Sequence, residues 1–356
     1  EFGVGKLTQL RNMLESSVVE VSDAFHRVTD LNPGMFEELI DKYQIQCDYK
    51  KGIAHPNHKQ KYCEESKQYV DHMIKNYDYK DMVYLSDDEM REVTGSDTYY
   101  GGSYDEAEAH CHPLNYALGI AKATLSAGAK IYENSPATSY KVLDDHVRVN
   151  TKNGSIKADR IVLACNGYLE NLEKSLTSKI LPMNNYIVAT KPLDDETVQK
   201  INPKDIAFAD SRFVINYFRM SADKRLLFGG GENYSQELSK NIVPIVTRPL
   251  EKIYPFLKGI KIDYAWGGKL AITMNRLPFF ASLHNEKVIS AQGYSGQGVA
   301  LASYSGKIVS EKILGNGEVF DIMAKIPRQS FPGGRFLRNL WRRCQEGRSY
   351  FRYYPN

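Results

Sequence analysis

Apolar side chains recur at helical spacing in several parts of the chain. Between residues 5 and 25 they stand every three or four positions, which is typical of an amphipathic helix. A second helix is expected over residues 33–43, and a polar, lysine-rich one over residues 57–76. A further helix begins at Pro113, where the missing N–H is tolerated, and ends at Gly128.

Short apolar runs predict strands between and after these helices. Gly101 and Gly102 beside aromatic residues indicate a change from strand to loop. Asn153-Gly154 favours the tight turn of a hairpin between residues 139–150 and 155–158. Further strands are expected over residues 47–54, 130–133, 160–165, 186–190, 213–219 and 225–228, with a helix over 243–256.

The strongest candidate for chemistry is a glycine-rich loop between an apolar strand, residues 288–292, and a helix rich in small residues. This order directs backbone N–H groups at an anion or a polar ring edge, and small residues let a planar cofactor approach. A tight turn in an α/β sheet explains the pattern equally well. The candidate cofactor-binding residues here are Gly293, Tyr294, Ser295, Gly296, Gln297 and Gly298.

Two further segments carry weaker signals. The buried strand over residues 160–165 ends in small residues, and such an end can lie beside the adenosine half of a dinucleotide. The segment 264–268 has a tryptophan and two glycines that would form a flat cofactor wall. A plain strand and turn, and a core tryptophan, are the alternatives. The candidates are Ala164, Asn166, Gly167, Trp266, Gly267 and Gly268.

Composition limits the class of protein. The 356 residues are 42% hydrophobic and 25% charged, enough to bury the cores of two domains. The net charge of +3 comes from mixed charges, so we expect no nucleic-acid partner. No apolar run approaches the ~20 residues that span a bilayer, so no integral membrane association is expected.

The five cysteines are scattered and none has CxxC spacing, so neither a disulfide framework nor a zinc site is expected. A reducing, cytoplasmic setting is the simplest interpretation. His110 and His112 suggest a metal, but no cysteine or carboxylate stands at ligand spacing, which favours a role at the start of the following helix. We expect no metal site.

In order along the chain, the motifs match a known family. They are Tyr100-Gly101-Gly102, His110 to Tyr116, Ala164 to Leu169, Tyr217 to Gly230, Trp266-Gly267-Gly268, Thr273 to Pro278, Gly293 to Gly298, and Phe331 to Gly334. This set resembles the D-amino-acid oxidase-type FAD-dependent oxidoreductases, and within them the bacterial gamma-glutamylputrescine oxidase branch.

The resemblance implies an α/β fold of mixed α+β character. It predicts a Rossmann-like FAD-binding domain, interleaved with a mostly antiparallel β substrate-binding domain. The expected FAD-binding parts are residues 1–45, 106–180 and 265–325, the substrate-binding parts 46–105 and 181–264, and a C-terminal helical tail 326–356.

The sequence departs from the family at two places. The family begins with a strand and a Gly-x-Gly-x-x-Gly turn. Here the opening has no initiator Met, and Gly3-Val4-Gly5 is not followed by the third glycine and has no strand before it. We therefore interpret the chain as a fragment or a processed product that lacks the first βαβ unit and binds FAD weakly or not at all. Gln297 stands where the family has a histidine, and it can donate a hydrogen bond but does not titrate near neutral pH.

The resemblance also implies an activity. The family oxidises an amine C–N bond with FAD, the imine is hydrolysed, and O₂ is reduced to hydrogen peroxide. The implied partners are O₂ and a small-molecule amine, expected to be gamma-glutamylputrescine or a related polyamine derivative; a homo-oligomer is possible. The candidate catalytic residues are Tyr217, Arg219 and Trp266, the first two on one face of a strand.

Several alternatives stay open from the sequence. Arg219 would equally form a structural ion pair with Asp223 or another acid. The family's amino-acid oxidases carry a carboxylate-binding arginine just before the Thr273 stretch, where this chain has Lys269 and Leu270. This favours an amine, with a glycine, sarcosine or D-amino-acid oxidoreductase as the alternative. A catalytically dead remnant is a further alternative.

Overall fold

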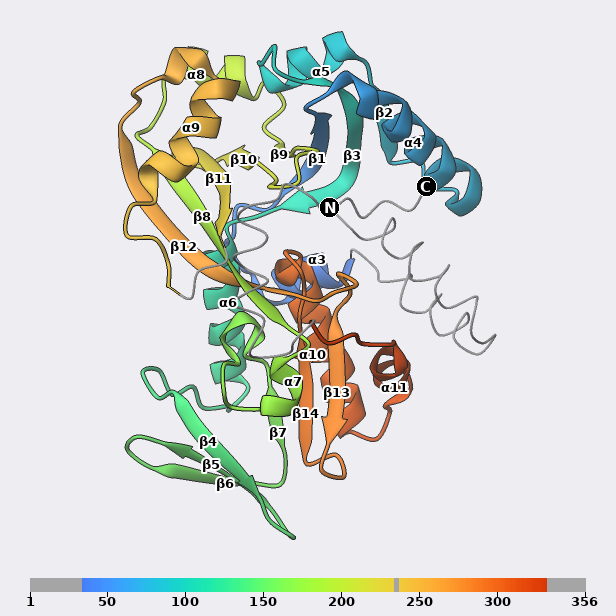
Figure 1. Cartoon of the computed structure of the whole chain (residues 1–356), viewed down its shortest axis with the longest axis vertical. Helices are drawn as coiled ribbons and strands as arrows, with labels where there is room; N and C mark the ends of the chain where they lie inside the picture. Colours follow the sequence, from blue (N-terminus) through green and yellow to red (C-terminus); the bar gives the residue numbers. More distant parts are fainter. Residues whose placement is uncertain (1–33, 234–236, 332–356) are drawn as a thin grey trace.

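The computed structural model describes residues 34–233 and 237–331, and its largest element is an eight-stranded sheet (Figure 1). The strand order is β12-β8-β11-β10-β9-β1-β3-β2, and every neighbouring pair is antiparallel except β1 and β9. The strands are β1 (Lys50–Asn57), β2 (Met82–Leu85), β3 (Tyr100–His110), β8 (Leu181–Thr190), β9 (Ala207–Ala209), β10 (Tyr217–Met220), β11 (Leu226–Asn233) and β12 (Ile262–Ile272).

Helices cover one face of this large sheet. Phe218 stacks between Phe208 and Phe228, with ring centroids 4.7 and 5.4 Å apart, and these rings share a core with Val246 and Leu250 of α9. Because side chains alternate along a strand, the neighbours of these residues point to the opposite face of the sheet. The covering elements are α5 (Asp87–Thr94), α8 (Asp195–Ile201), α9 (Val243–Ile253) and η3 (Pro255–Leu257), while α4 (Cys63–Tyr77), after η1 (Gln60–Tyr62), packs on β2 and β3.

A smaller sheet lies beside the large one. It has the order β13-β14-β7, and β14 runs parallel to β7. Its core joins Ile289 to Ile308 and Phe320 of the two helices that follow. The elements are β7 (Ile161–Leu163), η2 (Asn166–Tyr168), α7 (Lys174–Thr177), β13 (Phe279–Leu283), β14 (Val288–Gln292), α10 (Gly298–Ile313) and α11 (Glu318–Lys325).

The remaining elements lie next to these sheets. Strands β4 (Ala137–Val142), β5 (Val147–Thr151) and β6 (Ser155–Ala158) form a separate antiparallel sheet. Helix α3 (Gly34–Tyr43) packs on α6 (Pro113–Ser126), where Phe36 and Tyr116 stack at 4.1 Å. None of the described helices is both long and apolar enough to cross a bilayer.

Most expected elements are present. The helices predicted over residues 33–43, 57–76 and 113–128 are α3, a shorter α4 and α6, and the Asn-Gly turn joins β5 to β6. The strand, glycine loop and helix over residues 288–313 are confirmed. His112 is the N-cap of α6, its Nδ1 accepting from the Asn115 N–H at 3.3 Å, which confirms a role at the helix start.

Three expectations are wrong. Residues 130–133 form no strand and link α6 to β4 irregularly. Gly101 and Gly102 do not end their strand, because β3 continues to His110; an added Cβ at Gly102 would lie 2.2 Å from the His55 carbonyl oxygen, so this glycine permits close strand pairing. Strand β10 begins at Tyr217 rather than at residue 213.

Two predictions fall wholly or mainly outside the described residues. They are the helix over residues 5–25 and most of the helical tail, since residues 326–331 are irregular and the tail beyond them is not described. The domain boundaries stay predictions.

Candidate active site

The two cofactor motifs meet at one edge of the small sheet. Strands β7 and β14 are parallel, with Ile161 opposite Val288, so their carboxyl ends lie side by side. The side-chain Oδ1 of Asn166, which follows β7, accepts a hydrogen bond from the N–H of Gly293 at 3.1 Å. The structure therefore joins segments that are 127 residues apart in the sequence.

Glycines allow these segments to press against β12. An added Cβ at Gly167 would stand 2.8 Å from the Lys269 carbonyl oxygen. At Gly293, where φ is +76°, it would stand 2.7 Å from Cγ2 of Thr273. Gly296 differs, because its added Cβ would meet nothing within 4 Å, so the backbone is open on that side.

The rest of the glycine loop is anchored on the end of β12. The N–H of Ser295 donates to the Ala271 carbonyl at 2.9 Å, and Ser295 Oγ lies 3.3 Å from the N–H of Thr273. The buried Tyr294 donates its hydroxyl to the Ala291 carbonyl at 3.0 Å. The loop and the Thr273 stretch thus form one unit, and β12 connects it to the large sheet.

This unit, which we call the glycine cradle (residues 164–167, 267–268 and 293–298), fits a flat, polar cofactor. Gln292 is fully buried, and neither its Nε2 nor its Oε1 has a hydrogen-bond partner among the described residues. Nε2 of Gln297 is also buried without a hydrogen-bond partner among the described residues. Gln297 lies at the start of α10, where the first backbone N–H groups lack partners within the helix. Buried polar atoms without partners are rare, so a bound group that supplies partners fits them.

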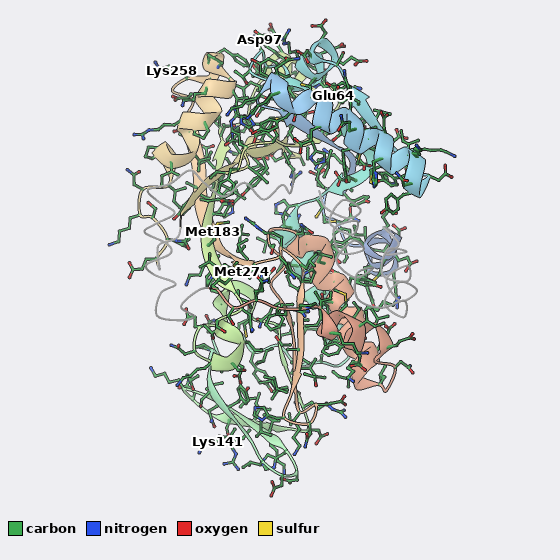
Figure 2. The ribbon with its side chains drawn as sticks, turned by 45° about the vertical axis from the view of Figure 1, so that its right-hand side comes forward. Glu64, Asp97, Lys141, Met183, Lys258 and Met274 are labelled. Atoms are coloured by element: carbon green, nitrogen blue, oxygen red, sulfur yellow. The ribbon has the colours of Figure 1, made fainter. Side chains whose placement is uncertain are left out.

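Figure 2 shows where the two sheets come together. Met183 of β8 and Met274 after β12 lie near the middle of the molecule. They belong to a small apolar cluster with Leu181, Ile272 and Phe331. The glycine cradle therefore lies next to the face of the large sheet that is opposite to α9.

Tyr217 and Trp266 share this face of the large sheet, opposite to α9. Across neighbouring strands, Trp266 is opposite Ile187, Ile187 is opposite Gly229, and Gly229 is opposite Tyr217. Because residues directly opposite each other point to the same side of a sheet, Trp266 and Tyr217 lie on one face. The Tyr217 ring covers Gly229, whose added Cβ would lie 2.1 Å from it, and the Tyr217 hydroxyl donates to Asn185 Oδ1. Trp266 is 44% exposed. A substrate facing the cradle would meet both rings.

Arg219 lies on the same strand face but is already engaged. It is 9% exposed, and its Nη1 lies 3.4 Å from Asp48 Oδ2 and 3.4 Å from His110 Nδ1. Burial, and then the Arg219 charge, lower the pKa of His110 to about 4. Asp223 pairs with Arg225 at 2.6 Å instead. These contacts favour the structural ion-pair alternative, with Asp48 as the acid.

Glu232 is a candidate that the sequence interpretation missed. Strand β11 changes register between Gly230 and Asn233, where a β-bulge inserts one residue. Asn233 is opposite Asn184, so Glu232 shares the face of Asn185 and Tyr217 rather than the helix-covered face. The run of glycines before Glu232 is visible in the sequence and hints at an irregular strand. The bulge that turns the Glu232 side chain to this face cannot be predicted from the sequence.

Electrostatics support this placement of Glu232. Burial raises the pKa of the Glu232 carboxyl to about 7, with Arg276 acting in the opposite direction. Burial also raises the pKa of Tyr217, and the charge of Glu232 is the second cause. A carboxyl group that titrates near neutral pH, beside a tyrosine, can accept or donate a proton during a reaction.

Other chemistry has less support. Among the described residues no group of three or more histidines, cysteines or carboxylates can hold a metal ion. Lys269 stands at the position of the family's carboxylate-binding arginine, and its Nζ forms an ion pair with Glu170 Oε1 at 3.7 Å.

A glycine cradle at the ends of parallel strands, beside an antiparallel sheet that carries aromatic and acidic groups, is the arrangement expected of a cofactor-dependent oxidoreductase. The sequence profile of the FAD dependent oxidoreductase (DAO) family matches residues 9–312. The chain belongs to this family of FAD-dependent oxidoreductases.

Individual relatives agree. The chain is 34% identical over 310 residues to the probable oxidoreductase OrdL of Haemophilus influenzae, covering 86% of this chain and 71% of that protein. It is 34% identical over 331 residues to the gamma-glutamylputrescine oxidoreductase of Escherichia coli, covering 90% and 76%. The structure of glycine oxidase from Geobacillus kaustophilus superposes with a TM-score of 0.72 at 17% identity, covering 88% and 85%, which confirms the mixed α/β fold.

Proposed function

We propose that this protein oxidises the C–N bond of a primary amine that belongs to an acylated polyamine, such as gamma-glutamylputrescine. The imine product is hydrolysed to an aldehyde. FAD, when bound, supplies the hydride acceptor and passes the electrons to O₂, giving hydrogen peroxide. The observation that carries the proposal is the row of Tyr217, Trp266 and Glu232 on the sheet face beside the glycine cradle.

The cradle residues would hold the cofactor. The backbone of Gly296 to Gly298 and the side chain of Gln297 would donate hydrogen bonds to a polar ring edge. Ala164, Asn166 and Gly167 would lie against the adenosine side, and Gly267 and Gly268 would leave room beside the ring. Gln292 supports this assignment because both of its polar side-chain atoms are buried without partners among the described residues.

Glu232 is proposed as the group that accepts the proton from the substrate ammonium. An amine must be neutral to release a hydride equivalent from its carbon. A carboxyl whose pKa is about 7 is half ionised at neutral pH, which suits a general base. Tyr217 and Trp266 would position the carbon chain, and Arg219 would position β10 through Asp48.

The amino-acid oxidoreductase alternative also has an observation in its favour. Arg276 is exposed, follows β12 and lies close enough to Glu232 to influence its charge. A guanidinium there could bind the carboxylate of glycine, sarcosine or a D-amino acid. Glu232 argues against this, because a carboxyl group in the same place would repel an α-carboxylate.

Hydrogen peroxide production distinguishes the two activities. The purified full-length protein, supplied with FAD, is expected to release peroxide with gamma-glutamylputrescine and to stay inactive with glycine, sarcosine and D-alanine. Activity with the amino acids alone would favour the alternative. A folded protein that is inactive with every substrate would support the catalytically dead remnant.

A cytoplasmic location is part of the same proposal. The four described cysteines, Cys47, Cys63, Cys111 and Cys165, are free thiols, which suits a reducing compartment.

A further inference from the structure

Asn185 of β8 connects the residues proposed to meet the amine with the glycine cradle. Its side-chain Oδ1 accepts a hydrogen bond from the hydroxyl of Tyr217 on β10. In the register of the large sheet it stands opposite Gly268, which belongs to the cradle. Glu232, on the bulged end of β11, shares the face of Asn185. Asn185 therefore lies between the proposed amine site and the cradle.

The hydrogen bond to Asn185 decides what the Tyr217 hydroxyl can offer a ligand. A phenol oxygen has one proton to donate, while its lone pairs accept. Burial, and then the charge of Glu232, raise the pKa of Tyr217, so the hydroxyl keeps its proton at neutral pH. Because that proton goes to Asn185 Oδ1, the Tyr217 oxygen is left as an acceptor.

The structure leaves room beside this pair. Asn185 is only partly buried, and Gly268 opposite it has no side chain. An added Cβ at Gly268 would meet only the Tyr168 hydroxyl, 3.8 Å away. Because residues directly opposite each other share a face of the sheet, this space lies on the side of Asn185 and Tyr217. A small polar group of a ligand fits there.

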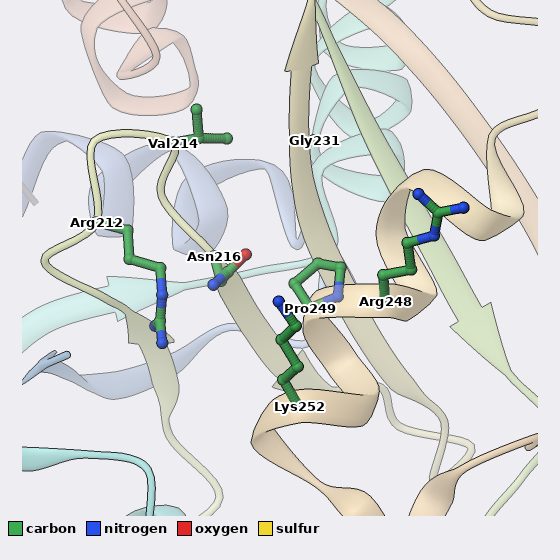
Figure 3. Close-up of a pocket in the computed structure, with 7 residues that line it drawn as sticks. All are labelled: Arg212, Val214, Asn216, Gly231, Arg248, Pro249 and Lys252. Atoms are coloured by element: carbon green, nitrogen blue, oxygen red, sulfur yellow. The ribbon is translucent and has the colours of Figure 1, made fainter. Parts of the chain in front are cut away.

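The cations of the adjoining pocket lie on the other face of the sheet. That pocket, of about 300 Å³, has three cationic residues in its wall: Arg212, Arg248 and Lys252 (Figure 3). Gly231 belongs to the same wall, and an added Cβ there would stand 2.3 Å from Cγ2 of Ile245 on α9. The sheet thus separates these donors from Tyr217. Arg276, the cation that acts on Glu232, is exposed.

We propose that Asn185 makes this face select an ammonium group over a carboxylate, by holding the Tyr217 hydroxyl so that its oxygen accepts. The inference rests on the proposed amine oxidation and gives that site a positioning residue. One proton of the substrate ammonium passes to the ionised Glu232, which leaves a neutral amine and a neutral carboxyl group. A remaining N–H of the amine donates to the Tyr217 oxygen and fixes the direction of the nitrogen lone pair.

Two ligands of the same shape test the role of Asn185 in the FAD-loaded full-length protein. Tert-butylammonium and pivalate share a tert-butyl group, and the amine cannot be oxidised because the carbon next to its nitrogen has no hydrogen. Calorimetry should find tert-butylammonium bound more tightly than pivalate by the wild type. Asn185→Leu frees the Tyr217 hydroxyl to donate, so the ratio of the two Kd values should narrow about tenfold. Asn171→Leu, at an exposed asparagine before α7, should keep the wild-type ratio.

Two further variants separate this role from a general effect on the fold. Asn185→Asp, whose oxygens only accept, should keep at least the wild-type preference, and Asn185→Leu should change nothing further in a Tyr217→Phe background. A wild type that binds both ligands equally, an Asn185→Leu variant with the wild-type ratio, or an equal loss of preference in the Leu and Asp variants would overturn the assignment. Absent oxidation with an intact, Asn185-dependent preference would refute only the proposed activity.

Discussion

At the scale of single residues, the chemistry that we propose for this face depends on Glu232. A carboxylate exposed to water would be ionised throughout the neutral range and would be a weak base. Burial moves the pKa of Glu232 to about 7, although Arg276 opposes the shift. Tyr217 lies beside it and has its own pKa raised by burial first and by Glu232 second.

Replacing Glu232 is expected to change the pH dependence of catalysis. In the wild type kcat/KM should fall as pH drops below about 7, because a protonated Glu232 cannot accept a proton from the substrate. Glu232→Gln should lose this acid limb and be about 100-fold slower at pH 8. Steady-state kinetics across pH check this, with the exposed Glu92→Gln on α5 as the control. An unchanged acid limb in Glu232→Gln would rule out the base.

The same substitution should alter stability in a pH-dependent way. The folded pKa of about 7 lies above the ordinary value of 4.5, so the folded state binds the proton more tightly. The stability that this gives is present below pH 4.5 and is lost as pH rises through 7. Glu232→Gln should therefore gain on the order of 1–3 kcal/mol over the wild type at pH 8.5 and nothing at pH 4.5, by urea unfolding. An equal difference at both pH values would contradict the buried carboxylate.

At the scale of elements, the cradle depends on backbone atoms that approach closely. Gly167 presses on β12, and an added Cβ would meet the Lys269 carbonyl oxygen, a backbone atom that a side-chain rotation cannot move. The hydrogen bond from Gly293 to Asn166 joins the two strand ends. A larger residue would push β7 and β12 apart.

Gly167→Ala is expected to destabilise the protein by about 1–3 kcal/mol and to reduce the amount of FAD that copurifies. Gly154→Ala, in the β5–β6 turn, is the matched control, because its added Cβ meets nothing within 4 Å and its φ is not in the left-handed region. That control should stay within about 0.5 kcal/mol of the wild type with normal FAD content. Flavin absorbance per mole of protein measures the FAD content, and thermal unfolding measures the stability. Equal FAD content and equal stability of the two variants would disprove the close approach at Gly167.

The sequence predicted those features of the fold and site that depend on local pattern. The strand before the glycine loop, the helix after it and the cap at His112 follow from spacing and residue type. Features that depend on distant partners could not be predicted. Arg219 meets Asp48, which is 171 residues away, rather than the nearby Asp223.

Register was a second source of error. Glu232 reads as an ordinary polar residue at a strand end, and only the bulge in β11 turns it toward Tyr217. The sequence predicts a strand end at Gly101 and Gly102, whereas β3 continues, because glycine is common both in loops and in closely paired strands.

At the scale of the whole molecule, the site is formed by segments from most of the described chain. The cradle uses residues after β7, within β12 and after β14, and the large sheet also contributes β8, β10 and β11. β12 belongs to both, since it pairs with β8 and contacts η2. A ligand bound there would stabilise the assembly as a unit.

FAD is therefore expected to raise the melting temperature of the full-length protein, which should unfold in a single transition. Ligand at 100 times its Kd adds about 2.7 kcal/mol to a protein that binds only when folded. Scanning calorimetry with and without added FAD measures the shift, which should be several degrees for the wild type and smaller for Gly167→Ala. A transition temperature independent of FAD would show that the cradle does not hold it.

The most direct test of the account is anaerobic reduction of the flavin in the FAD-loaded full-length protein. Without O₂, gamma-glutamylputrescine should bleach the visible flavin absorbance within one turnover, more slowly in Tyr217→Ala, while D-alanine and glycine leave it unchanged. Bleaching by an amino acid but not by the amine, or a flavin that no amine reduces, would contradict amine oxidation at this site.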